Sequence, residues 1–133
     1  MKFLVMLTAD QADYDAMSGR DTARAWSRQD LDTMYAHMGA LNEDLVASGE
    51  LIEAQGLAEP AQARLVSADP HGTPVVSDGP YGVEERVPCG FWLVECAGRE
   101  RAVEIAARAW SCPVPVGTPK PPVVVHPVDE GEP

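Results

Sequence analysis

The stretch that decides the fold is SRQDLDTMYAHMGALNEDLVAS, residues 27–48. Ser27 is a natural N-cap, and Asp30 stands three residues later, where its carboxylate can bond back to the cap. Gly49 can take the left-handed conformation that ends a helix. Apolar side chains recur every three or four residues and form one stripe: Leu31, Met34, Met38, Leu41 and Leu45. The pattern predicts one long amphipathic helix that needs a second layer to pack against.

Trp26 precedes this helix and is placed to pack on Leu31 as a hydrophobic staple. A second amphipathic helix is predicted over residues 98–110, and a short surface helix around residues 21–26. Residues 113–122 contain five prolines, so we expect an extended, helix-free connection there. Short apolar runs bounded by turn residues predict strands over residues 2–8, 51–57, 63–68, 74–77, 91–96 and 123–128.

The order strand, helix, strands, helix, strand predicts an α+β fold of the ferredoxin-like, split βαβ type. In this plan two helices cover one face of an antiparallel sheet. The first strand is apolar on both sides, because Phe3 and Val5 alternate with Leu4 and Met6. Both sets cannot face the helices, so we expect a second copy of the chain to cover the other face. Residues 1–128 are predicted to form a single domain, followed by a disordered acidic tail over residues 129–133.

Composition excludes several classes of function. The formal net charge is −11, from 10 basic and 21 acidic residues, so nucleic acids and anionic membranes are poor partners. No apolar run approaches the roughly 20 residues that span a bilayer, and no signal peptide is recognisable. Three cysteines without CxxC spacing predict neither a disulfide framework nor a zinc site, so we expect a cytoplasmic protein. Nucleotide-binding motifs are missing and the histidines are scattered, so no cofactor and no metal are expected.

Several short motifs follow one another in an order known from one family. Asp78-Gly79-Pro80-Tyr81 is similar to the DGPF signature of the YCII-related family, with Tyr in place of Phe. Four other segments resemble that family in the same order: NEDLVASG at 42–49, GLAEP at 56–60, GFWL at 90–93 and HPV at 126–128. Together with the opening MKFLVML, the resemblance covers most of residues 2–128.

The resemblance implies a dimeric α+β barrel, in which two ferredoxin-like sheets pack face to face. Some members of this family are cofactor-free enzymes of small aromatic or ring-opened compounds, and others occur with extracytoplasmic-function sigma factors. The chain departs from the family pattern at two places: Val83 stands where Glu is usual, and His126 where Arg is usual. Loss of a carboxylate and exchange of a fixed cation for a titratable group indicate a different ligand.

Three residues are the candidates for acid–base chemistry. His126 lies in an apolar strand, where its imidazole could accept or give a proton, although it could equally be an interface histidine bonded to backbone. Asp78 could orient His126 or act as a base, or it could simply cap a turn. Tyr81 could donate to a developing oxyanion, or close the site as a hydrophobic plug.

Three further residues are candidates for contact with a substrate. Trp92 alternates with Phe91 along one strand, so one of the two faces any cavity at the sheet. His37 lies on the flank of the long helix's apolar stripe, where it could reach a pocket or remain solvated.

Cys89 has no neighbouring cation or helix N-terminus in the sequence, so we do not expect it to be a nucleophile.

Two functions are compatible with these observations. The first is a cofactor-independent enzyme of the lyase, isomerase or cyclase type, which transfers protons on a small molecule in specialised biosynthesis. The second is a non-catalytic homodimer that binds a small ligand or serves as a regulatory module, linked to a sigma factor by the resemblance. Both predict a small-molecule ligand and place it on the sheet face that the helices leave open.

Overall fold

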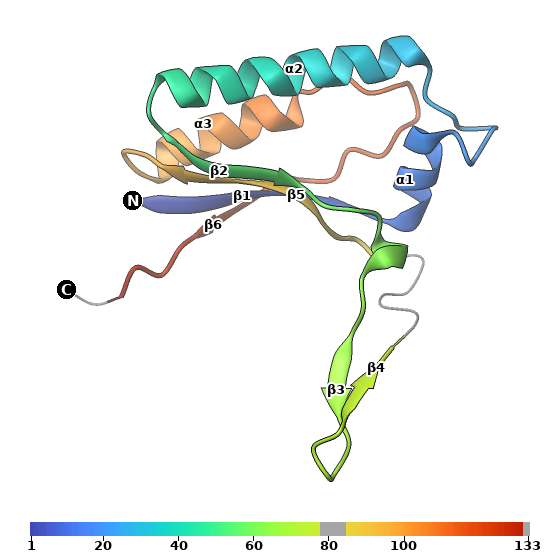
Figure 1. The fold of residues 1–133 in the computed structure, drawn as a ribbon. Coiled ribbons are helices and arrows are strands. Elements are labelled where there is room, and N and C mark those ends of the chain that lie inside the picture. Colours follow the sequence, from blue (N-terminus) through green and yellow to red (C-terminus); the bar gives the residue numbers. More distant parts are fainter. Residues whose placement is uncertain (78–84, 132–133) are drawn as a thin grey trace.

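The computed structural model describes residues 1–77 and 85–131. Its described helices and strands are arranged as two long helices above a sheet, with a shorter helix at one end and a hairpin projecting away (Figure 1). In chain order the elements are β1 (Lys2–Ala9), α1 (Gln11–Ser18), α2 (Arg28–Ala47), β2 (Leu51–Gly56), the 3-10 turn η1 (Pro60–Gln62), β3 (Val66–Ala68), β4 (Pro74–Val76), β5 (Val87–Glu95), α3 (Arg99–Trp110) and β6 (Val124–Pro127).

The main sheet is antiparallel and has the strand order β2-β5-β1-β6. β5 therefore lies between β1 and β2, which are joined through α2, and β6 returns to the outer edge of β1. This is the split βαβ topology of the ferredoxin-like plan, so the predicted α+β fold is confirmed. β3 and β4 pair only with each other and form the projecting hairpin.

The long helix forms as its sequence predicts. The Ser27 hydroxyl accepts a hydrogen bond from the Asp30 N–H at 3.0 Å, and the Asp30 carboxylate accepts one from the Ser27 N–H at 2.8 Å. Gly49 follows the helix with a φ of 78°, the left-handed conformation expected there. Leu41 and Leu45 are buried against the sheet. Capping at the start and burial along one stripe together fix this helix.

The predicted short helix at residues 21–26 is wrong, and a helix stands earlier in the chain instead. α1 begins after Asp10, whose side chain accepts from the Asp13 N–H at 2.8 Å, while Asp13 accepts from the Asp10 N–H at 3.2 Å. This is the same reciprocal capping as at Ser27. Its apolar stripe is short, and only Ala16 is buried, so periodicity gave little signal for it.

The two faces of the sheet differ in what covers them. Phe3 and Val5 of β1 point towards α2 and α3 and are buried, together with Trp92 and Val94 of β5. The intervening side chains lie on the opposite face, where no described element covers them, and they are partly exposed: Leu4, Met6, Phe91, Leu93 and Val124. We call these the covered face and the open face.

Residues 113–122 form the predicted extended connection, which we call the proline segment. It leaves α3, runs out towards the end of the molecule where α1 lies, and returns to the sheet at β6 (Figure 1). Gly117, with a φ of 86°, and a bond from the Thr118 N–H to the Pro115 carbonyl at 3.1 Å turn the segment back. The proline rings fix φ along the rest of its path.

Candidate functional site

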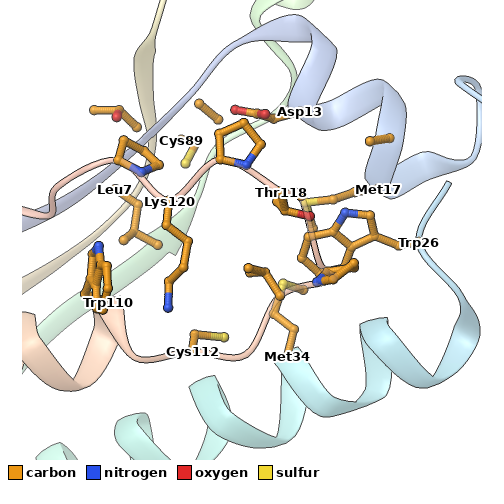
Figure 2. A pocket seen from close by; sticks show the side chains of 18 of the residues that line it. Leu7, Asp13, Met17, Trp26, Met34, Cys89, Trp110, Cys112, Thr118 and Lys120 are labelled. Atoms are coloured by element: carbon orange, nitrogen blue, oxygen red, sulfur yellow. The ribbon is translucent and has the colours of Figure 1, made fainter. Parts of the chain in front are cut away.

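A pocket of about 400 Å³ lies on the covered side of the sheet, beneath the proline segment. Its walls come from β1, α1, α2, the C-terminal end of α3 and the segment itself, as Figure 2 shows. The volume falls within the range of roughly 300–1,000 Å³ that small-molecule sites occupy. Elements distant in the sequence therefore enclose one space next to the core.

The pocket lining is mainly apolar and includes several flexible methionine side chains. Trp26 and Trp110 come from opposite ends of the lining, and Cys112 and Met34 lie between them in Figure 2. The remaining large apolar side chains come from β1, α1 and α2: Leu7, Met17 and Met38. Methionine side chains adapt to irregular shapes and contact aromatic rings favourably. Such a lining suits a flat or branched hydrophobic molecule.

One wall of the pocket carries an ion pair. Arg86 donates to the Asp13 carboxylate at 3.0 Å and to the Thr8 carbonyl at 3.0 Å, and it lies 3.8 Å from the Asp10 carboxylate. Its positive charge is thereby already balanced within the protein. The pair joins the N-terminal end of α1 to β1 and the start of β5, which fixes this wall of the pocket.

Two cysteines line the pocket, and both are protonated at neutral pH. Burial raises the pKa of Cys89 to about 11, although the nearby Arg86 lowers it in part. Burial also raises the pKa of Cys112, against an opposing effect of Lys120. A nucleophilic cysteine needs a lowered pKa. The sequence predicts no cation near Cys89, but Arg86 lies close enough to act on it, and burial has the larger effect.

The predicted site residues that the structure describes lie outside this pocket. His126 is on the open face, opposite Leu4 in the register, and its Nδ1 is 2.9 Å from the Pro127 carbonyl oxygen. Phe91 is on the same face, opposite Met6. Asp78 and Tyr81 lie outside the described residues, so whether they meet His126 stays a prediction.

Trp92 and His37 are tied into the scaffold. Trp92 is 5% exposed, and its indole N–H donates to the Asn42 Oδ1 at 2.6 Å, which anchors α2 to β5. His37 Nε2 is 2.7 Å from the Arg108 carbonyl near the end of α3, and it must be the donor because a carbonyl only accepts. Neither residue lines the pocket, nor do Phe91 and His126.

Within the described ranges, no three His, Cys, Asp or Glu side chains gather in a way that could hold a metal ion. Among the same residues, none of the helices has the length and apolarity to cross a membrane.

Comparison with known proteins places the fold in a family. Residues 1–111 match the YCII-related domain. An uncharacterized protein of Rhizobium meliloti (strain 1021) is 27% identical over 82 residues, which are 62% of this chain and 65% of that protein. The match thus spans slightly less than two thirds of the relative's length. The proline segment begins after the matched domain ends.

Proposed function

Starting from the fact that this chain belongs to the YCII-related domain family, we propose that it binds a small, mainly apolar molecule in the pocket beneath the proline segment. The single observation that carries this proposal is a cavity of about 400 Å³, lined by tryptophan and methionine side chains beside a well-packed core. Binding there needs no cofactor, since burial of apolar surface supplies the affinity.

The energetic case rests on which side chains line the space. A compact monomer rarely leaves tryptophan and methionine side chains around an unfilled hollow, because their contacts with neighbours stabilise the fold. Here Trp26 and Met34 border the pocket from the start of α2, and neither is among the fully buried core residues. A hydrophobic guest would bury them further, at about 25 cal/mol for each Å² removed from water.

Calorimetric titration with the neutral probe 2-naphthamide tests this proposal. Met34→Trp fills the pocket from α2, whereas Tyr35→Trp places the same ring on the solvent side of that helix, where Tyr35 is exposed. We expect the wild type and Tyr35→Trp to bind the probe, and Met34→Trp to bind it at least about tenfold more weakly. Absence of binding to the wild type, or equal binding to both variants, would contradict the proposal.

The open face supports a second part of the proposal, that a second copy of the chain covers it. Leu4, Met6, Phe91 and Leu93 form an apolar surface on adjacent strands there. A contiguous apolar face of this kind marks an interaction surface. Sedimentation analysis should report a dimer at micromolar concentration. A monomer throughout that range would contradict this part.

Acid–base catalysis remains a second candidate function, favoured by the position of His126. Its imidazole lies on the apolar open face beside Leu4, where a partner copy would desolvate it. In this hypothesis His126 transfers a proton, Asp78 orients it and Tyr81 stabilises charge. A screen for turnover of small hydrophobic acids would test it: His126→Ala and Asp78→Asn should each lower the rate roughly 10²–10⁴-fold. Unchanged turnover in both variants would contradict it.

A further inference from the structure

The pocket lining includes a cation, Lys120, for which the described residues provide no paired carboxylate. Lys120 comes from the proline segment, and its Nζ lies 4.0 Å from the centroid of the Trp110 ring. Figure 2 shows its side chain extending from the segment between Trp110 and Cys112. Among the residues that the structure describes, no carboxylate lies within ion-pair distance of this amine.

A second cation at the pocket, Arg24, also lacks an ion pair with any described carboxylate. Arg24 lies in the loop after α1 and lines the pocket. By contrast, the third cation, Arg86, is paired with Asp13. Both Lys120 and Arg24 are exposed to solvent at the pocket, where a ligand carboxylate can reach them.

We propose that the pocket takes a small organic acid, with its apolar body among the tryptophan and methionine side chains and its carboxylate bound by Lys120. This inference rests on the proposed function and adds the chemical class of the ligand. The ammonium group on a flexible stem can turn from the Trp110 ring to a carboxylate, since an ion pair with hydrogen bonds is stronger than an exposed cation–π contact. Arg24 adds a longer-range attraction.

Lys120 lies beyond the residues that match the family domain. The match to the family domain ends at residue 111, whereas the proline segment that carries Lys120 begins at residue 113. Its prolines restrict the unbound backbone, so little conformational entropy is lost when the segment closes on a ligand. The residues that match the family domain thus supply most of the pocket walls, and the proline segment supplies the group that selects an acid.

Two probes of similar shape, one charged and one neutral, separate the contribution of charge to the binding affinity from that of apolar burial. Calorimetric titration with 2-naphthoate and with neutral 2-naphthamide should show tighter binding of the acid by about tenfold at low salt. The sequence contains only two lysines, Lys2 and Lys120, so Lys2→Gln is a matched control with the same change in net charge. Lys120→Gln should abolish the preference without changing the affinity for the amide, whereas Lys120→Arg and Lys2→Gln should retain it.

The possible outcomes distinguish this inference from the proposed function. Equal affinity of the wild type for both probes, or a preference that survives in Lys120→Gln, would overturn the organic-acid assignment while leaving a neutral apolar site. Failure of both probes to bind would overturn the pocket proposal as well. Loss of the acid preference in Lys2→Gln would show that overall charge, and not Lys120, determines it.

Discussion

The covered and open faces of one sheet have similar numbers of apolar side chains but very different surroundings. On the covered face, Phe3 and Trp92 are packed beneath α2 and α3, and the pocket opens where that packing ends. On the open face, Leu4 and Phe91 are only partly buried by their neighbours in the sheet. Period-two alternation in β1 and β5 produces both faces, and segments distant in the sequence enclose a pocket beside only the covered one among the described residues.

The two phenylalanines of the chain give the largest expected contrast between the faces. Phe3 is 1% exposed on the covered face, so Phe3→Ala should lower the free energy of unfolding by about 3–5 kcal/mol at every protein concentration. Phe91→Ala should cost less than about 2 kcal/mol in the isolated chain. Urea unfolding at two protein concentrations measures both. If both substitutions lowered the free energy of unfolding equally, with no dependence on protein concentration, the proposed difference between the two faces would be contradicted.

The reactivity of the Cys89 thiol reports how far the pocket wall is shielded from water. Burial raises its pKa to about 11 from an ordinary 9.0, so its thiolate fraction at pH 7.5 should be roughly 100-fold lower than that of an unburied cysteine. Alkylation by iodoacetamide, followed by peptide mass spectrometry, should be correspondingly slow and should accelerate about tenfold per pH unit up to pH 10. A rate that levels off below pH 9 would contradict this environment.

A single hydrogen bond on the covered face should have a smaller effect. Trp92→Phe removes the indole donor to Asn42 and should cost about 1–2 kcal/mol of unfolding free energy, because the Asn42 oxygen loses its partner in a partly buried position. Trp110→Phe is the control, since Trp110 is 47% exposed and should cost less than about 0.5 kcal/mol. The comparison fails if both substitutions have the same effect in thermal unfolding.

The smallest expected effect concerns the tie between α3 and β2. Hydrogen bonds from Arg101 lower the pKa of Glu50 below its ordinary value of 4.5. A carboxyl group whose pKa is lowered in the folded protein stabilises the fold at pH values above its ordinary pKa. This stabilisation is lost as the pH falls through the lowered pKa of the folded state. Wild type should therefore be more stable than Glu50→Gln at pH 7, and the two should converge in acid. Glu104→Gln, which removes an exposed partner of Arg101, should change little.

Local signals in the sequence predicted much of the fold. Ser27 and Asp30 identify the start of α2 by themselves, and the apolar run of β1 identifies a strand. The helix α1 was missed, although Asp10 and Asp13 form the same capping arrangement, because its apolar stripe is too short to stand out. Capping residues spaced three apart would have been the better guide at that position.

The pocket could not be read from the sequence in the same way. Trp26 was assigned to a staple and the proline segment to a connection, because each is understandable locally. Their joint role depends on the path of the segment from α3 past α1 to β6, which long-range packing decides. The predicted site at His126 and Asp78 concerns the open face, and it stays a prediction. The match to the family domain ends at residue 111, before the proline segment begins.

The most direct test of the account uses the five methionines of the chain. Met17, Met34 and Met38 line the pocket, whereas Met6 lies on the open face and Met1 at the exposed N-terminus. Titration of methyl-¹³C-methionine protein with 2-naphthamide, followed by NMR, reports on all five at once. The account predicts shifts at the three pocket methyls and none at Met6 or Met1. Shifts at Met6, with the pocket methyls unchanged, would contradict it.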